Sequence, residues 1–284
     1  MSNKETAISS IRMTCVGNGE DDILGLKKAQ QAIEALGVEV SVNHITSMSA
    51  LGIVVAEQKN IIVLTLKNVP LEIPAGYCIA ALSERDDPSY SLVISNPDAY
   101  EEGRLLKLKE NATIDCFAPI YCLQLNDFRP DVKALAITDP DRNQYIKSSV
   151  GFMINSYIFE INGPYKKAPI TVPLNPKEFI PMPGQGVLAF LAPKKNKPLR
   201  RLLKQIHHPE VAKATNIERG IMAKFPEHPS NLAAYCEIDK EGNYHVYAVK
   251  PHAKTGKAHY IQHSSNTSAN LVETIVKKWK EAEN

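Results

Sequence analysis

Residues 59–70 read KNIIVLTLKNVP, and an almost unbroken apolar run fills the centre of this stretch, from position 61 to position 66. A short run of this kind, closed by polar residues and a proline, is typical of a β-strand buried on both faces, as in a parallel sheet. Lys67 and Asn68 follow the run directly, so we expect them in the loop that ends the strand. Lys67 is then either an anion-binding side chain or a solvated loop lysine.

The segments on either side of this strand predict a β-α-β unit that continues into a sheet. Residues 11–16 alternate in polarity, and residues 38–45 (VEVSVNHI) form a second strand-like stretch. Between them, apolar residues recur at helical spacing from position 26 to position 36, and Gly37 follows as a helix-ending residue. This order of elements favours a parallel sheet. A further apolar strand is predicted at residues 77–82 (YCIAAL).

The remaining two thirds of the chain predict further strands and a change of character near the end. The elements expected in the middle are a less cleanly alternating strand at 113–121, a strand at 132–137, an apolar strand or helix at 151–161, a largely irregular proline-rich stretch at 164–183, and a strand at 187–191. The last third predicts a helix at 209–224, an antiparallel meander at 233–238, 244–249 and 259–263, and an amphipathic C-terminal helix.

The composition is that of an ordinary globular protein. The 284 residues are 44% hydrophobic and 23% charged, and the net charge of +2 implies no general attraction to polyanions. Five cysteines without a C-x-x-C pair favour reduced thiols over a disulfide framework or a zinc site. No stretch has the apolar length of a signal peptide or a bilayer-spanning helix. We therefore expect a cytoplasmic monomer without nucleic-acid or membrane partners.

Several motifs occur in an order that resembles one known family. They are L-K-N-V-P at 66–70, R-P-D at 129–131, P-M-P-G-Q-G at 181–186, and E-R at 218–219 followed by A-A-Y at 233–235. Together they resemble the hydroxymethylbilane synthase (porphobilinogen deaminase) family, in which a similar strand ends in H-S-x-K-D-V-P. The resemblance extends over nearly the whole chain.

The resemblance implies an α/β fold with three domains. Two would be doubly wound domains like those of periplasmic binding proteins, with a ligand cleft between them, and the third a small α+β C-terminal domain. The implied boundaries are residues 1–100 with 186–204 for domain 1, 101–185 for domain 2 and 205–284 for domain 3.

The residues that carry the family's chemistry are largely replaced. Asn68 stands where the family has its catalytic Asp, and a neutral amide cannot shuttle a proton as a carboxylate can. No catalytic set is therefore expected intact, and Lys67 and Asn68 are relict positions. Arginines that would hold the carboxylates of the substrate are also missing, at Val16, Ile120, Tyr121, Thr138 and Gln144.

The anchor of the family's cofactor is replaced as well. Family members hold a dipyrromethane through a cysteine, and counting from either side puts His228 or Pro229 at that position. Cys236 lies beyond it, on a predicted strand. The chain is therefore expected to lack the dipyrromethane. The stretch between Thr46 and Lys67 is also much shorter than in the family, where it includes a glycine-rich lid.

Three functions remain open at this point. The first is a degenerate, non-enzymatic family member that binds a ligand or acts as a non-catalytic partner in tetrapyrrole metabolism, with Lys67, Arg85 and Gln185 lining the cleft. The second is a divergent active synthase, a transferase that polymerises porphobilinogen. The third is a binding module for an unrelated small molecule. The histidines match no standard ligand spacing, so no metal site is expected.

Overall fold

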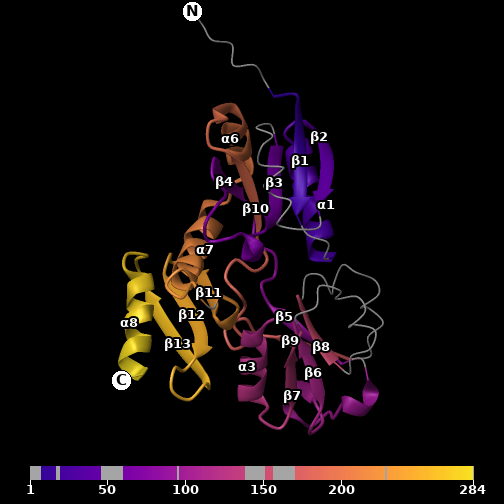
Figure 1. Ribbon diagram of the computed structural model, residues 1–284, viewed down its shortest axis with the longest axis vertical. Helices are drawn as coiled ribbons and strands as arrows, with labels where there is room; N and C mark the ends of the chain where they lie inside the picture. Colours follow the sequence, from indigo (N-terminus) through magenta and orange to yellow (C-terminus); the bar gives the residue numbers. More distant parts are fainter. Residues whose placement is uncertain are drawn as a thin grey trace, which may run out of the picture. The chain divides into compact units, whose positions relative to one another are not determined.

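The computed structural model describes residues 8–16, 20–45, 60–94, 96–137, 151–155, 170–227 and 229–283. The chain divides into two compact units, whose elements are labelled in Figure 1. Unit 1 comprises Met1–Asp86 and Gly184–Ala212, and unit 2 comprises Asp87–Pro183 and Lys213–Asn284. Each unit therefore contains segments that are far apart in the sequence.

Unit 1 is built on a five-stranded sheet in the order β2-β1-β3-β10-β4. Its strands are β1 (Ser10–Val16), β2 (Glu39–Ile45), β3 (Asn60–Thr65), β4 (Tyr77–Leu82) and β10 (Leu188–Pro193). β1 is parallel to β2 and β3, whereas β10 is antiparallel to β3 and β4. Helix α1 (Glu20–Glu34) connects β1 to β2, so the predicted β-α-β unit is confirmed.

β3 is the central strand of this sheet, and its apolar sequence accounts for that position. Ile61 and Val63 join one apolar cluster, which includes residues of α1 and of α6 (Lys197–Leu203). Ile62 and Leu64 join a second cluster. Successive side chains of a strand point to opposite faces, so the two clusters cover the two faces of the sheet. A strand buried in this way requires an apolar residue at almost every position.

Unit 2 contains a second five-stranded sheet, in the order β7-β6-β8-β5-β9. Its strands are β5 (Tyr90–Ile94), β6 (Thr113–Cys116), β7 (Lys133–Ala136), β8 (Gly151–Asn155) and β9 (Ile170–Leu174). β6 is parallel to β7 and β8, and β5 is antiparallel to β8 and β9. Both sheets thus have one reversed strand in the fourth place. The reversed strands, β5 and β10, are the first strands formed after the chain passes from one unit to the other.

The second sheet corrects two expectations about individual elements. The strand predicted at 113–121 ends at Cys116, and helix α3 (Pro119–Phe128) follows, because the fixed φ of proline suits the first turn of a helix. β5 falls within the range predicted for domain 1 but pairs in the second sheet; the domain boundaries themselves stay predictions. β9 forms in the stretch predicted to be irregular, and its Pro173 is tolerated because β9 is an edge strand.

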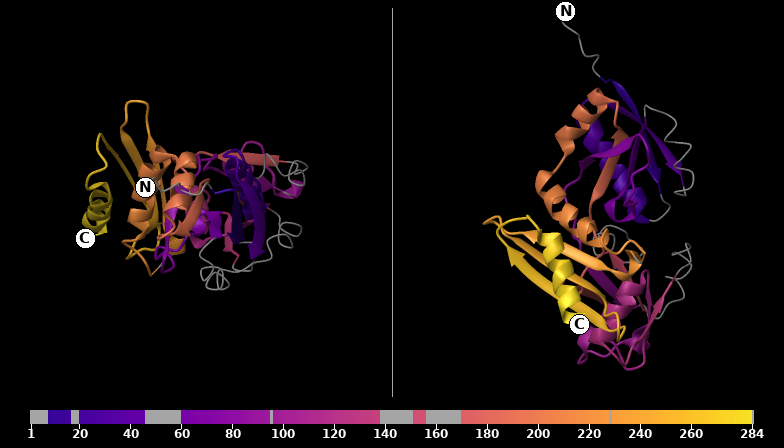
Figure 2. Two further views of the ribbon diagram at one scale, coloured as in Figure 1. Left: turned by 90° about the horizontal axis from the view of Figure 1, so that it is seen from above. Right: turned by 60° about the vertical axis from the view of Figure 1, so that its left-hand side comes forward.

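Unit 2 also contains a three-stranded antiparallel sheet with a helix on it. The strands are β11 (Ala233–Ile238), β12 (Tyr244–Pro251) and β13 (Ala258–Ser265). Helix α8 (Leu271–Glu283) lies along one face of this sheet (Figure 2), and buries Leu271, Ile275 and Trp279. The indole Nε1 of Trp279 donates a hydrogen bond to the carbonyl oxygen of His259, 3.1 Å away. The predicted meander and C-terminal helix are confirmed.

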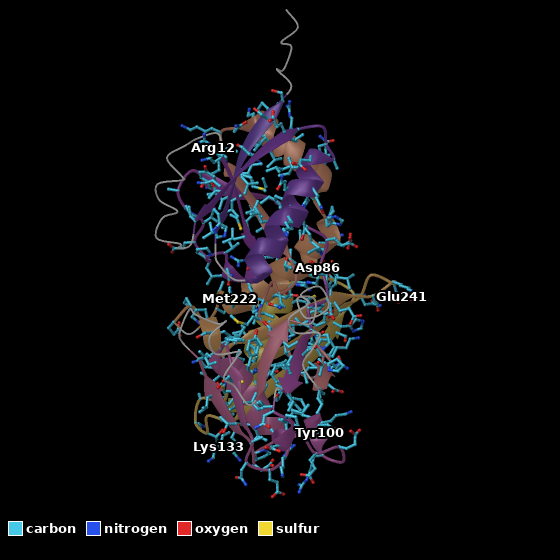
Figure 3. All side chains as sticks on the ribbon, turned by 90° about the vertical axis from the view of Figure 1, so that its right-hand side faces the viewer. Arg12, Asp86, Tyr100, Lys133, Met222 and Glu241 are labelled. Atoms are coloured by element: carbon cyan, nitrogen blue, oxygen red, sulfur yellow. The ribbon has the colours of Figure 1, made fainter. Side chains whose placement is uncertain are left out.

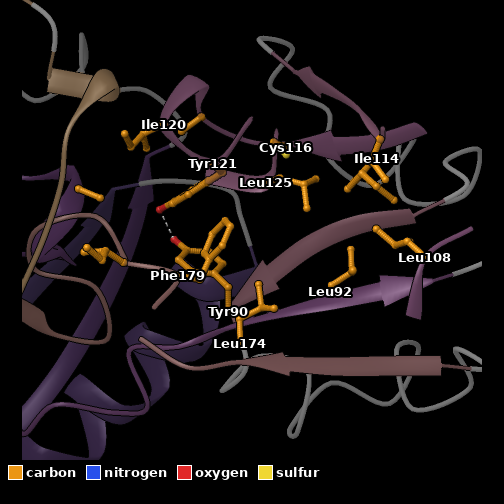
Figure 4. Close-up of a cluster of buried hydrophobic side chains, with 14 of the residues drawn as sticks. Tyr90, Leu92, Leu108, Ile114, Cys116, Ile120, Tyr121, Leu125, Leu174 and Phe179 are labelled. Carbon is orange, nitrogen blue, oxygen red and sulfur yellow. Dashed lines mark hydrogen bonds between the residues drawn. The ribbon is translucent and has the colours of Figure 1, made fainter. Parts of the chain in front are cut away.

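The core of unit 2 joins its two sheets. Leu92 of β5, Ile114 of β6 and Leu125 of α3 belong to one buried cluster (Figure 4), and Ala233 of β11 and Val249 of β12 are members of the same cluster. The small antiparallel sheet therefore completes the core of the second α/β sheet. The predicted mixed α/β class is confirmed as two five-stranded sheets and one smaller antiparallel sheet.

Candidate functional site

Three loops of unit 1 meet where strand β3 ends. Leu188, the first residue of β10, lies opposite Thr65, the last residue of β3, and Ala189 lies opposite Leu82, the last residue of β4. The loops after β3, after β4 and before β10 are therefore neighbours at one edge of the sheet. We call this edge, with Lys67, Asn68, Arg85 and Gln185, the Lys67 edge. Ligands of open α/β sheets bind at the carboxyl ends of the strands.

Backbone hydrogen bonds hold the three loops together. The N–H of Leu66 donates to the carbonyl oxygen of Val187 (2.7 Å), and the N–H of Asp86 donates to that of Gly186 (2.8 Å). The hydroxyl of Ser83 accepts from the N–H of Leu188 (2.9 Å). The loop after β3 and the loop after β4 are thus each bonded to the segment that leads into β10.

The segment before β10 requires glycine at position 184. Gly184 has φ of +80°, a region that residues with a Cβ adopt at a cost. A Cβ at this position would lie 2.8 Å from Cγ of Leu66 and 3.1 Å from its carbonyl carbon. Leu66 is fully buried and cannot yield easily. The G-Q-G motif therefore allows the close approach that places Gln185, which is 1% exposed, beside the β3 loop.

Lys67 and Asn68 form a short helical turn with Leu66, between two buried anchors. Leu66 and Val69 pack into the apolar cluster on one face of the sheet, and the N–H of Val69 donates to the carbonyl oxygen of Leu66 (3.1 Å). Lys67 is half-buried, and Asn68 is exposed. The loop therefore presents one ammonium group and one neutral amide, with no carboxylate of its own.

A charge pair stands beside these groups. Nζ of Lys28 in α1 donates to Oδ1 of Asp86 at 2.6 Å (Figure 3 labels Asp86), and both side chains are about one third exposed. Asp86 follows Arg85, which is half-buried. Arg85, Lys67 and Lys28 are cationic, and Asp86 is paired with Lys28. The Lys67 edge therefore carries both cationic and acidic side chains, since Glu84 and Asp87 belong to the same loop as Arg85 and Asp86.

His207 also belongs to this region, although its sequence context marked it only as one of several histidines without metal-ligand spacing. Its Nδ1 accepts a hydrogen bond from the backbone N–H of Leu82 (3.1 Å), and the N–H of His208 donates to the carbonyl oxygen of Leu82 (3.1 Å). Burial lowers the pKa of His207, and the nearby His208 and Lys204 lower it further. The imidazole is therefore neutral near pH 7, and it caps the end of β4.

The positions that the resemblance assigns to substrate-binding arginines are apolar and buried where the structure describes them. Val16, Ile120 and Tyr121 are 4%, 1% and 2% exposed. The hydroxyl of Tyr121 donates a hydrogen bond to the hydroxyl of Tyr90 at 2.6 Å (Figure 4), and the centroids of the two rings are 4.6 Å apart. Thr138 and Gln144 lie outside the described residues.

The structure describes only one of the two candidate positions for the cofactor anchor. His228 lies outside the described residues, and Pro229 is exposed at the start of a short helical turn. Cys236 is 1% exposed on β11, where its N–H donates to Oε1 of the buried Glu218 (2.9 Å). The nearest thiol along the chain is therefore inside the core of unit 2 rather than in a loop.

Within the described ranges, no group of three or more His, Cys, Asp or Glu residues could hold a metal ion. No helix in those ranges is long and apolar enough to cross a membrane.

Comparison with known proteins points to one family. The family model described as "Porphobilinogen deaminase, dipyromethane cofactor binding domain" matches residues 48–139. Porphobilinogen deaminase from Desulforamulus reducens is 27% identical over 162 residues, which is 56% of this chain and 50% of that protein. The porphobilinogen deaminase from Thermobifida fusca is 26% identical over 219 residues, 72% of this chain and 66% of that protein.

The chain is therefore similar to porphobilinogen deaminases over part of its length, at low identity. The chain spans about half the length of the first curated porphobilinogen deaminases it matches. The matched range includes Lys67, Asn68, Arg85, Ile120 and Tyr121, whereas Gln185 lies beyond it.

Solved structures resemble this chain at low similarity. They include YhfZ from Shigella flexneri, 12% identical over 72% of this chain and 92% of that chain, with a TM-score of 0.36. Lipoprotein Tp32 from Treponema pallidum is 11% identical over 70% of this chain and 90% of that chain, with a TM-score of 0.41. TM-scores of this size carry no argument about this chain.

Proposed function

We propose that this chain is a catalytically degenerate porphobilinogen deaminase-like protein that binds a small anionic ligand at the Lys67 edge and does not polymerise porphobilinogen. The loop that would carry the catalytic carboxylate is well anchored through Leu66 and Val69, but it presents Asn68 instead. The scaffold of the site is therefore retained while its acid is absent. Binding without turnover is the function that such a combination supports best.

The burial of Ile120 and Tyr121 is the observation that carries this proposal. These residues begin α3, and their side chains belong to the apolar core of unit 2 (Figure 4). A charged guanidinium there would be desolvated without a partner, which costs several kcal/mol. The start of α3 is therefore built to fill a core, and it offers no bidentate partner to the carboxylates of a growing pyrrole chain.

The described residues do not fit a covalently held dipyrromethane. The attachment needs a thiol in a loop, and the exposed Pro229 offers none. Cys236 is buried, and the backbone N–H that it supplies to Glu218 fixes its strand in the core. We therefore propose that the protein lacks this cofactor and that any tetrapyrrole-related role is one of binding or of non-catalytic partnership.

The test of ligand binding uses single charge removals. Calorimetric titration with porphobilinogen, acetate and propionate should show saturable binding of at least one of these anions. Lys67→Ala and Arg85→Ala should each weaken it by roughly 10- to 150-fold, because a charge-assisted hydrogen bond contributes about 1.5–3 kcal/mol. Lys254→Ala is the matched control, since Lys254 is exposed in the turn between β12 and β13. Equal losses in all three variants, or binding of none of the three anions, would sink the proposal.

A divergent active synthase is the second candidate, and the names of the relatives favour it, since those relatives are porphobilinogen deaminases. The two candidates differ in covalent chemistry. An active synthase must hold growing pyrrole units and release a product, whereas the degenerate protein binds its ligand reversibly. The monomeric state, the cytoplasmic location and the lack of nucleic-acid or membrane partners stay predictions.

A further inference from the structure

A chain of hydrogen bonds links an aspartate, a histidine and a serine across the small antiparallel sheet of unit 2. Asp239 directly follows β11, His245 lies in β12 and Ser264 lies in β13. His245 and Ser264 are opposite each other in the register of β12 and β13, so their side chains share one face of the sheet. The fold therefore brings together three side chains that are separate in the sequence.

The distances give this chain a direction. Nε2 of His245 lies 3.0 Å from Oδ2 of Asp239, and Nδ1 of the same ring lies 2.8 Å from Oγ of Ser264. A carboxylate can only accept a hydrogen bond, so Asp239 places the proton of the neutral imidazole on Nε2. Nδ1 is then the acceptor, and the hydroxyl of Ser264 donates to it. This is the arrangement in which a histidine can take the proton of a nucleophilic hydroxyl.

Asp239 is itself held in place by the turn that follows it. The backbone N–H of Asn243 donates to Oδ1 of Asp239 (2.7 Å), and the side-chain amide of Asn243 donates to Oδ2 (3.0 Å). The hydrogen bonds from His245 and Asn243 lower the pKa of Asp239 to about 2. The carboxylate is therefore ionised at neutral pH, and it fixes the orientation of the imidazole. Asp239 is a positioning residue in this arrangement.

The hydroxyl at the end of the chain is open to solvent. Ser264 is exposed, and the side chains of His245 and Asp239 are 28% and 26% exposed. The next residue, Ser265, differs in its partners: its hydroxyl donates to the carbonyl oxygen of Thr267 (2.9 Å) and accepts from the N–H of Thr267 (3.2 Å). Ser265 is therefore the matched control, because it is a neighbouring serine bonded to backbone instead of to an imidazole.

We propose that Ser264 is a nucleophilic serine, with His245 as its general base, that accepts the acyl group of small carboxylic esters. Oγ of Ser264 bonds to the carbonyl carbon of the ester, and its proton passes to Nδ1 of His245. The bond between that carbon and the alcohol oxygen then breaks, and the alcohol leaves with the proton from His245. The acyl group is now bound to Ser264 as an ester.

Water completes the reaction through the same two side chains. A water molecule gives a proton to Nδ1 of His245 and bonds to the acyl carbon, and the bond to Oγ of Ser264 breaks. The acyl group leaves as a carboxylic acid, and Ser264 regains its proton from His245. The reaction uses residues of unit 2 alone, so it does not depend on the anion site proposed for unit 1.

The first experiment labels the full-length protein with a fluorophosphonate, which transfers its phosphonyl group to an activated serine with loss of fluoride. Trypsin cuts after Lys257 and Lys277, so Ser264 is recovered in the peptide of residues 258–277. We expect one label in this peptide, which fragmentation places on Ser264. Ser264→Ala should lose the label, and Ser265→Ala should keep it. Ser264 is exposed, so Ser264→Ala should fold like the parent.

The second experiment measures hydrolysis of para-nitrophenyl acetate. His245→Ala should lower the rate by roughly 100-fold or more, because a positioned general base contributes an effect of about that size. Asp239→Asn should also lower the rate. Nitrogen NMR of the His245 ring separates positioning from loss of structure: the neutral ring should carry its proton on Nε2 in the parent and on either nitrogen in Asp239→Asn, with the amide signals of the sheet unchanged.

Three results would each overturn the proposal. They are the absence of any label at Ser264, labelling at the same rate in His245→Ala as in the parent, and ester hydrolysis that Ser264→Ala leaves unchanged. In each case the three side chains would only hold the strands of the sheet together.

Discussion

Gly184→Ala tests the close packing that positions the Lys67 edge. The substitution adds two separate costs. The φ of +80° costs a residue with a Cβ roughly 1–2 kcal/mol. The new Cβ would also lie 2.8 Å from Cγ of Leu66, whose side chain is fully buried. Overpacking of this kind typically costs about 1–3 kcal/mol. We therefore expect Gly184→Ala to lower the free energy of unfolding by about 2–5 kcal/mol.

Gly76→Ala separates the two costs. Gly76 is also in unit 1 and has φ of +85°, but a Cβ there would have no atom within 4 Å. It should therefore show the backbone cost alone, about 1–2 kcal/mol. The difference between the two variants is the steric cost of the contact with Leu66.

The assay is urea unfolding of both variants and the parent, with the slope m compared so that only changes in the midpoint are read as stability. Gly184→Ala should also weaken anion binding, because a displaced Leu66 moves the adjacent Lys67, whereas Gly76→Ala should leave binding unchanged. Equal destabilisation by the two variants would refute the reasoning, since it would mean that Leu66 gives way without cost.

Three further predictions follow from the fold and the site. The hydrogen bond from Arg129 lowers the pKa of Asp131 from 3.8 to about 2. This carboxylate therefore stabilises the fold fully above pH 3.8, and the stabilisation is lost as the pH falls through about 2. Asp131→Asn should flatten this part of the curve of unfolding free energy against pH, and an unchanged slope in this pH range would contradict the prediction. Gln124→Leu should lower the free energy of unfolding, measured in urea, by about 2–4 kcal/mol, because the buried amide of Gln124 satisfies both the N–H and the carbonyl oxygen of Ile180. A loss below about 1 kcal/mol in the same assay would count against this. Asn68→Asp combined with His228→Cys should not produce bilane from porphobilinogen, since the missing arginines remain missing; turnover near that of an authentic deaminase would show that the middle of the chain has been misaligned.

The elements that the sequence predicts are those whose pattern of apolar residues alone indicates the element type. Residues 61–64 and Leu66 are apolar because both faces of β3 are covered, and a run this short between polar ends favours a strand over a helix. Leu271, Ile275 and Trp279 predict the C-terminal helix for the same kind of reason, since their spacing gives one buried stripe.

The parts that the sequence does not predict depend on partners far along the chain. The residues of β5, YSLVI, favour a strand, but they do not indicate that the strand pairs with β8 and β9 in the second sheet. His207 takes its place at the end of β4 through a hydrogen bond from Leu82, which is 125 residues away in the sequence. The start of α3 at Pro119, by contrast, could have been predicted from the sequence, because proline is favoured in the first turn of a helix.

The intact mass of the purified protein, measured before and after incubation with porphobilinogen, tests the central claim most directly. A degenerate family member should show the mass of the bare 284-residue chain, about 31.4 kDa, in both samples, because it has no suitable thiol to hold pyrrole units. An added mass of pyrrole units in either sample, located on any cysteine, would contradict the account and support an active synthase.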